Sequence, residues 1–192
     1  MRKILLILLT CTSLYSCVAQ TFPMEGEDTP LLIKAGMSLK DTDNNLDKFE
    51  GTWIYEDGIS KLTVVLQKVE NYESAGYFSD MILGNYIYEE NGIEIINTLT
   101  NPAASQGSDD IYHIRMHGFK NSSKIVGGFK DPIRSKWTDY TLYLTYDLQD
   151  RLNPQPKLVW NIHIYEFYNP DGDVDARQEL RVPSLLTLTK VL

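Results

Sequence analysis

The chain has 192 residues and a formal net charge of −8 at pH 7, from 18 basic and 26 acidic side chains. Its length suits one domain with a short extension, and because an acidic protein repels phosphate backbones the charge disfavours nucleic-acid binding. Both cysteines, Cys11 and Cys17, lie close to the N-terminus. The domain that follows therefore has no internal disulfide and relies on its core for stability.

Residues 1–16 have the pattern of a secretory signal peptide. Two basic residues precede a short apolar run, Ile4 to Leu9, and the segment is shorter than the ~20 apolar residues that a membrane-spanning helix requires. The run ends in Leu14-Tyr15-Ser16-Cys17, which resembles the bacterial lipobox. In proteins with this signal the chain is cut before the cysteine and the thiol is acylated, so the resemblance implies membrane attachment through acyl chains on Cys17. The alternative is a cut after Ala19, which releases a soluble secreted protein.

Residues 17–47 are predicted to form a lipid-anchored tether. The segment is rich in Gly, Pro, Asp and Asn and poor in large apolar residues, as is typical of linkers. Leu31-Leu32-Ile33 is an apolar run that stands alone within it. The stretch from Asn44 to Glu50 is compatible with one helical turn that places Leu46 and Phe49 on the same side.

Residues 48–192 are predicted to form a single domain built from strands. Apolar and polar residues alternate with a period of two, and short turn sequences such as Asn91-Gly92, a strong hairpin signal, separate the alternating stretches. The pattern predicts nine strands: Thr52–Tyr55, Lys61–Gln67, Met81–Glu89, Ile93–Leu99, Ile111–Met116, Lys124–Phe129, Asp139–Tyr146, Lys157–Ile164 and Leu185–Val191.

The strand pattern indicates the fold class. Each strand has one polar face, neighbours in sequence are joined by short connections, and no long helix is predicted. Because open sheet edges promote aggregation, strands of this kind close into barrels or pack as sandwiches. We expect an all-β, antiparallel, up-and-down meander of eight or nine strands that closes, or nearly closes, into a barrel.

Two short motifs resemble those of lipocalins. Gly51-Thr52-Trp53 opens the first predicted strand and is similar to their Gly-x-Trp motif, and Thr138-Asp139-Tyr140 is similar to the Thr-Asp-Tyr motif that precedes their seventh strand. The third lipocalin signature, an arginine near the end of the eighth strand, is missing from residues 157–167. The resemblance implies a lipocalin-like strand order but transfers no ligand-binding residue.

The whole chain also resembles a family of lipoproteins from Bacteroidota whose function is unknown and which is classed as a domain of unknown function. The resemblance implies a location in the cell envelope and a fold, but no activity. Acidic residues after the cysteine usually mark surface export in that family, whereas Val18-Ala19-Gln20-Thr21 stands here, which favours the periplasmic face. The matching stretches are Leu14 to Cys17 with Ala19-Gln20, Lys40-Asp41-Thr42, Leu46 to Trp53, Val64 to Lys68 and Leu186 to Lys190.

Candidate metal ligands occur in two places, and neither fits a metal site. His113, Arg115 and His117 share one face of a predicted strand, but the two histidines lie about 13 Å apart along it, too far to share one ion without a bulge. A polar outer face is the expectation there. The loop with Asp171, Asp173 and Asp175 lacks the glycine and glutamate of a calcium-binding EF-hand, so we expect a solvated acidic loop.

No motif for a reaction is visible. The sequence contains no nucleophile elbow and no His-Glu-x-x-His, and it does not pair carboxylates by itself. We therefore expect neither an enzyme nor a cofactor.

The aromatic residues are the most informative candidates for a binding site. A closed eight-stranded barrel is either filled by side chains or holds one small ligand. The sequence leaves three functions open, in this order: binding of a small apolar ligand in an aromatic cup, a structural and interaction protein of the cell envelope with a filled barrel, and an enzyme whose site residues are scattered along the sequence. The aromatic residues predicted to point inward are Trp53, Tyr86, Tyr88, Tyr140, Tyr146 and Trp160.

Overall fold

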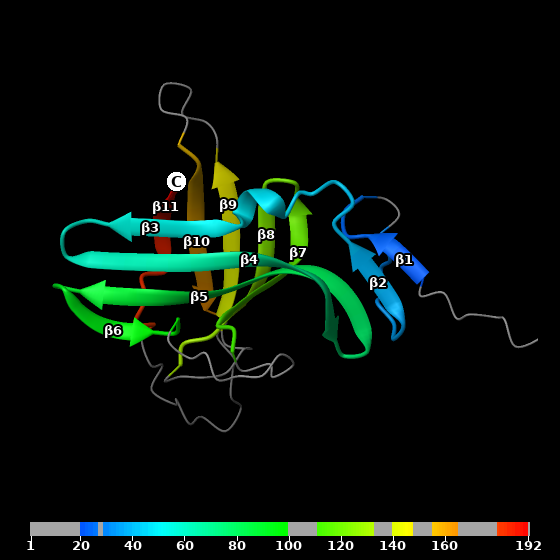
Figure 1. Cartoon of the computed structure of the whole chain (residues 1–192), viewed down its shortest axis with the longest axis horizontal. Helices are drawn as coiled ribbons and strands as arrows, with labels where there is room; N and C mark the ends of the chain where they lie inside the picture. Colours follow the sequence, from blue (N-terminus) through cyan, green and yellow to red (C-terminus); the bar gives the residue numbers. More distant parts are fainter. Residues whose placement is uncertain are drawn as a thin grey trace, which may run out of the picture.

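A computed structural model describes residues 20–26, 29–99, 111–132, 140–147, 155–164 and 180–191, and these ranges form one sheet-built body (Figure 1). No helix in this part of the chain is long and apolar enough to cross a bilayer.

Eight strands close into an antiparallel barrel. Each barrel strand pairs with the next along the chain, β5 pairs with β7, and β11 returns to β3 and completes the closure. The predicted up-and-down meander and closed barrel are therefore confirmed. The barrel strands are β3 (Gly51–Glu56), β4 (Ser60–Ser74), β5 (Tyr77–Glu90), β7 (Ile114–Asn121), β8 (Lys124–Phe129), β9 (Tyr140–Asp147), β10 (Lys157–Ile164) and β11 (Leu185–Lys190).

The alternating residues pack inward as their period predicts. Trp53 of β3 lies opposite Val64 of β4, which lies opposite Tyr86 of β5, and all three side chains are fully buried. Since successive side chains of a strand point to opposite faces, the polar residues between them face outward. The core thus runs through the centre of the barrel.

The ninth predicted strand, β6 (Ile93–Asn97), is present but lies outside the barrel. Asn91 and Gly92, with φ values of 50° and 75°, form the predicted tight turn and fold β6 back along β5. A bulge between Tyr88 and Glu89 interrupts this ladder, and Ile82 to Gly84 of β5 pair with β7 instead. Over Ile82 to Glu90, the edge of β5 that does not face β4 is thus shared between β7 and β6.

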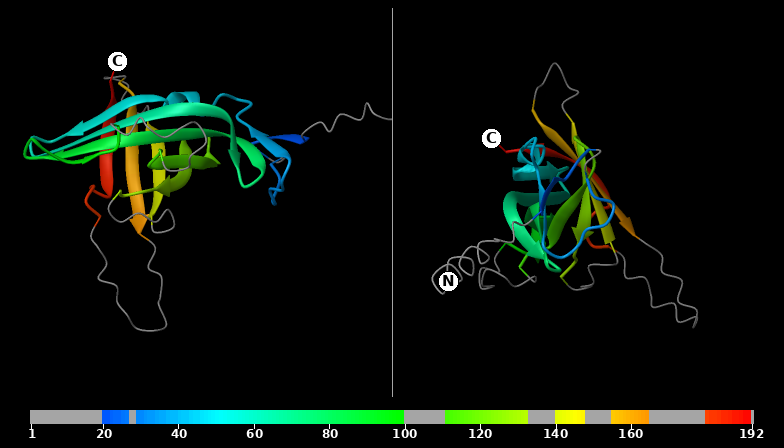
Figure 2. Two further views of the ribbon diagram at one scale, coloured as in Figure 1. Left: turned by 60° about the horizontal axis from the view of Figure 1, so that its bottom comes forward. Right: turned by 90° about the vertical axis from the view of Figure 1, so that its right-hand side faces the viewer.

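β4 and β5 continue beyond the barrel as a curved hairpin, residues 70–80, which we call the arm. A bulge between Val69 and Tyr72 starts the arm, and a turn with Ala75 and Gly76 at φ 49° and 83° ends it. The bulge increases the local twist of the strand pair and bends it away from the barrel axis. Figures 1 and 2 show the arm curling away from the barrel, at the end remote from β6.

Residues 17–47 were expected to form a tether, but the described part of this segment forms two short strands, one of which pairs with the arm. β1 (Gln20–Pro23) pairs in parallel with β2 (Met37–Lys40), and β2 pairs in parallel with β5 within the arm. Met24, Leu39 and Leu46 are buried. The arm offers a free strand edge whose backbone groups β2 satisfies, and local composition does not reveal such a distant partner.

The predicted helical turn is a 3-10 helix, η2 (Asp47–Phe49), directly before β3. Leu46 and Phe49 are both buried, as the turn predicted. η2 therefore covers the end of the barrel from which the arm extends.

Candidate binding groove

The barrel interior is filled by aromatic side chains. Trp53, Tyr86 and Trp160 are fully buried, and Tyr88 is 5% exposed. The ring centroids of Tyr86 and Phe129 are 5.1 Å apart, and those of Phe129 and Trp160 are 5.4 Å apart. These rings pack on one another, and the two hollows described below lie away from them.

Of the aromatic residues predicted to line a ligand cup, Trp53, Tyr86 and Trp160 therefore fill the barrel centre instead. Tyr146 is half-buried, with its ring centroid 6.3 Å from that of Trp53, and the side chain of Tyr140 lies outside the described residues. The indole N–H of Trp53 donates to the carbonyl of Phe49 at 2.8 Å, so this polar group needs no ligand. Ligand binding by these residues stays a prediction that their packing does not favour.

Lys190 covers Trp53 at the η2 end of the barrel. Its Nζ atom lies 5.3 Å from the centroid of the indole ring, within cation–π range. Gly51, with φ 125°, permits this approach, because a Cβ atom there would lie 2.8 Å from the Lys190 side chain. Residues 157–167, which lack an arginine, were predicted to contain the eighth strand. Because β6 is outside the barrel, the eighth barrel strand is β11, and the basic residue near its end is Lys190.

The Thr138-Asp139-Tyr140 motif is displaced in the same way. It precedes β9, which is the sixth barrel strand rather than the seventh, because β6 is not part of the barrel. The lipocalin-like strand count therefore fails at this motif, although the meander holds.

A buried ion pair ties the opposite end of the barrel. Asp131, which follows β8, is fully buried, and Arg181, before β11, donates to it through Nε at 3.1 Å and Nη2 at 2.5 Å. Bidentate pairs of this kind between a carboxylate and a guanidinium are strong and have a well-defined geometry. Both carboxylate oxygens are engaged, so the pair is a structural clasp between two segments far apart in sequence.

The larger hollow is a groove on the outer face of the sheet, between the arm and β7–β8. We call it the arm groove, and its volume is about 240 Å³. Its chemistry is mixed: a guanidinium, an imidazole, tyrosine rings with hydroxyls, and a thioether. The lining residues are Tyr72, Ser74, Tyr77, Met81, Arg115, His117 and Gly128.

Close strand packing positions the basic side of the groove. A Cβ atom at Gly127 would lie 1.9 Å from the carbonyl oxygen of Arg115 and 2.6 Å from Cα of Met116, so only glycine fits there. Ile114 and Met116 are buried in the core, which directs Arg115 between them to the outer face.

The charge of the groove comes from Arg115. Desolvation lowers the pKa of His117, and a hydrogen bond with the backbone of Arg115 offsets only part of this effect. His117 is therefore neutral at pH 7, whereas a guanidinium keeps its charge at any physiological pH. The wall of the groove thus contains a charged guanidinium and a neutral imidazole.

The shared polar face predicted for His113, Arg115 and His117 is only partly correct. His113 is buried, and its Nδ1 atom lies 3.0 Å from the side-chain oxygen of Asn85. The side chain of His117 is open to solvent at the groove, although neighbouring protein atoms surround it enough to lower its pKa. Within the described ranges no three metal-binding side chains cluster, and Asp171, Asp173 and Asp175 lie outside those ranges.

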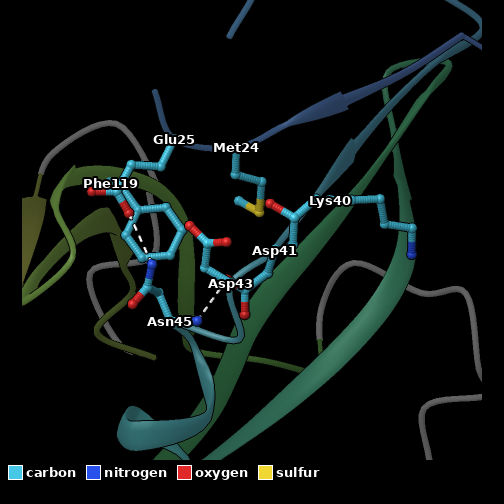
Figure 3. Close-up of a pocket in the computed structure, with 8 residues that line it drawn as sticks. Met24, Glu25, Lys40, Asp41, Asp43, Asn45 and Phe119 are labelled. Carbon is cyan, nitrogen blue, oxygen red and sulfur yellow. Dashed lines mark hydrogen bonds between the residues drawn. The ribbon is translucent and has the colours of Figure 1, made fainter. Parts of the chain in front are cut away.

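The smaller hollow lies between the loop that joins β2 to η2, the residues after β1, and Phe119 of β7 (Figure 3). Its volume of about 10 Å³ is enough for one water molecule at most. Asn45 crosses it, with its backbone N–H donating to Asp41 at 2.8 Å and its side-chain amide donating to Glu25 at 3.2 Å. This hollow is too small for a ligand.

A charged network beside this hollow holds the arm to the barrel, and we call it the arm joint. Asp80 accepts hydrogen bonds from Lys40 Nζ at 2.8 Å and from the backbone N–H groups of Asp41 and Asn71 at 3.0 Å each. Asp41 in turn lies 3.0 Å from Lys68. Burial alone raises the pKa of Asp80, but the bonds from Lys40, Asn71 and Asp41 outweigh it and hold the pKa below its usual value.

Sequence reasoning missed the arm side of the groove. Tyr72, Ser74 and Tyr77 lie on strand extensions that were not predicted, because Glu70 and Asn71 interrupt the alternation at the bulge. The usable signal was Ala75-Gly76, a turn dipeptide flanked by tyrosines at both sides.

Comparison with known proteins gives a family but no activity. No curated protein and no solved structure matches the chain. The sequence model of a family of unknown function, DUF6705, matches residues 1–191. Since the match covers nearly the whole chain, the protein belongs to this family.

Proposed function

We propose that the protein is a lipid-anchored, non-enzymatic binding protein of the bacterial cell envelope, facing the periplasm. In this proposal the filled barrel is a scaffold, and the arm groove takes a small anionic ligand with an apolar body. The lipobox-like Leu14-Tyr15-Ser16-Cys17 supports the anchor. The single observation that carries the binding role is the groove of about 240 Å³ with Arg115 in its wall.

The groove chemistry selects the ligand class. Ligand sites range from about 300 to 1,000 Å³, so this groove suits a small molecule or the end of a longer one. A guanidinium binds carboxylate or phosphate oxygens through charge-assisted hydrogen bonds. Tyr72, Tyr77 and Met81 supply apolar surface for the rest of the molecule.

The barrel interior is the weaker site for the small apolar ligand that the sequence suggested. A ligand there must displace Phe129 from between Tyr86 and Trp160. The centroid of the Phe129 ring lies 5.1 Å from that of Tyr86 and 5.4 Å from that of Trp160. Opening such a packed core costs several kcal/mol before any contact with a ligand forms. The outer groove requires no such rearrangement.

Equilibrium dialysis of two matched probes tests the proposal. The full-length lipoprotein in nanodiscs of neutral lipid is dialysed against 2-naphthoate and against its neutral analogue 2-naphthamide, with empty nanodiscs as the blank. We expect 2-naphthoate to bind about 10-fold more tightly, which corresponds to about 1.4 kcal/mol.

Two serine variants locate the bound probe. Ser74→Trp fills the groove and should abolish 2-naphthoate binding, whereas Ser122→Trp, on the exposed β7–β8 turn, should bind like the wild type. Equal affinity for the two probes, or unchanged binding by Ser74→Trp, would contradict the assignment.

A protein interface is the second candidate function, favoured by the end of the barrel opposite the arm. Ile59, Ile93 and Ile95 are 60%, 65% and 37% exposed there, and the N–H of Asn91 donates to the carbonyl of Ile59 at 2.7 Å, which joins the two turns. Among the described strands β6 pairs with β5 alone, so its second edge suits pairing with a partner strand. Photo-cross-linking from position 95 in living cells should give a discrete adduct that Ile93→Glu removes.

A further inference from the structure

Three consecutive large apolar residues are exposed between β1 and β2. Leu31, Leu32 and Ile33 are 101%, 74% and 46% exposed. Single exposed apolar residues are common on protein surfaces, but a contiguous group usually marks a contact with a partner or a membrane. Nothing in the proposed groove function uses this group, because it is not part of the groove lining.

The fold places this group at the tip of the arm, together with the point where the N-terminal segment joins the body. The N–H of Gly36 donates to the carbonyl of Gly76 at 2.8 Å, which fixes the segment after Ile33 to the arm turn. Gln20, the first residue of β1, lies opposite Met37. In Figure 1, β1 and β2 lie at one end of the long axis, and β6 lies at the other.

The chain length between Cys17 and this end is short. Only three residue steps separate Cys17 from Gln20, and a fully extended chain spans at most about 3.6 Å per residue, so the two lie within roughly 11 Å. Acyl chains on Cys17 therefore hold this end of the molecule, and not the β6 end, at the bilayer surface.

We propose that Leu31, Leu32 and Ile33 insert into the interface of the bilayer that holds the acyl chains, as a second anchor. The inference rests on the proposed lipid anchor. The acyl chains already attach the protein, so the three side chains need only add apolar contact at a bilayer surface that the anchor holds beside them. Charge attraction is unfavourable for this chain, with its net charge of −8, on an anionic membrane. Apolar insertion therefore adds to the membrane affinity and fixes the orientation of the barrel.

A single-thiol label tests the insertion directly. In the acylated protein cut before Cys17, Cys11 is removed and Cys17 is blocked, so Leu32→Cys carries one free thiol for the environment-sensitive dye NBD. The full lipoprotein is reconstituted into phosphatidylcholine vesicles that contain lipids with doxyl quenchers near the headgroup. The matched control is Ile93→Cys, an exposed apolar residue at the opposite end.

We expect the label at position 32 to shift to the blue and to be quenched by the doxyl lipids, at low salt and in 1 M salt alike, because apolar insertion is not screened. The label at position 93 should show neither effect. Water-like emission at position 32, or equal quenching at both positions, would overturn the inference while leaving the anchor in place. A blue shift that persists without vesicles, together with a dimeric mass, would assign the group to a second copy of the chain instead.

Two further readouts separate the insertion from the anchor. The intact mass shows whether Cys17 carries acyl chains, and an unmodified cysteine would overturn both the anchor and the inference. The triple variant Leu31→Ser, Leu32→Ser, Ile33→Ser should transfer to acceptor vesicles about 100-fold faster than the wild type, given the apolar surface removed from the membrane. The double variant Ile59→Ser, Ile93→Ser should transfer at the wild-type rate, and equal rates for the two variants would contradict the insertion.

Discussion

In the barrel core, Trp53, Tyr86 and Trp160 are fully buried among apolar neighbours, whereas at the arm joint the buried residues Asp41 and Asp80 are held by hydrogen bonds to lysines and backbone amides. The core gains its stability from removing apolar surface from water, a contribution that does not depend on protonation. The joint depends on ion pairs and hydrogen bonds, and the lowered pKa of Asp80 keeps that carboxylate charged. The barrel and the arm are therefore expected to respond differently to substitution and to pH.

The largest expected effect is in the barrel core. Trp160→Ala removes a fully buried side chain that packs on Phe129 and donates from its indole N–H to the carbonyl of Pro183 at 3.2 Å. We expect the free energy of unfolding to fall by about 3–5 kcal/mol, measured by urea denaturation. Trp160→Phe should lose less, because a ring remains in the cavity. A loss below about 1 kcal/mol for Trp160→Ala would show that the site is not packed.

An intermediate and local effect is expected at the arm joint. Asp80→Asn weakens the bonds that tie Lys40, Asp41 and Asn71 together, at a cost of about 1.5–3 kcal/mol. Amide exchange should accelerate over residues 72–79 and remain unchanged in β9 and β10. Uniform acceleration over the whole sheet would mean that the arm and barrel unfold as one unit.

Asp80→Asn also tests whether the stability of the arm joint depends on pH. The pKa of Asp80 is lower in the folded protein than in the unfolded chain, where an aspartate titrates near 3.9. The unfolded state therefore binds the proton first as the pH falls, so stability is present above about pH 3.9 and is lost below it. Asp80→Asn should lack this part of the acid-dependent loss, as followed by urea midpoints at successive pH values.

The smallest expected effect is at His117 in the arm groove. Desolvation lowers its folded pKa below the unfolded value of about 6.5, so protonation favours the unfolded state and stability decreases as the pH falls below about 6.5. His117→Gln should flatten the stability profile in that range without changing it at pH 8. An unchanged slope in thermal unfolding between pH 5 and 7 would assign the titration to another group.

The sequence predicted correctly those features that depend on the residues of a single strand or turn. Leu62, Val64 and Leu66 point inward as their spacing required, and Asn91-Gly92 forms the expected turn. Prediction from the sequence failed where pairing with a strand far away in the chain decides the position of a segment. β6 has strand chemistry but lies outside the barrel, and β1 and β2 lie in a segment of linker composition.

The candidate site shows the same division. Arg115 and His117 were singled out because they alternate with apolar neighbours on one strand, and both line the arm groove. Tyr72, Ser74 and Tyr77 were not, because they reach the groove only through the bulge and the curl of the arm. Six aromatic residues were predicted to line a ligand cup. Alternation predicts which way a side chain faces, but it does not predict whether space remains beside that side chain.

The sequence by itself determined the presence of the eight barrel strands, their inward faces and the closed meander, since these follow from a period of two and from turns within a few residues. It also carries the lipobox-like signal at Cys17, a short motif that requires no fold. Only the tertiary structure decided that the barrel centre is filled, that β6 leaves the wall and that the N-terminal segment docks on the arm. These outcomes depend on side-chain volume and on pairing between residues far apart in the chain, such as Leu39 with Ser79, which no local pattern encodes.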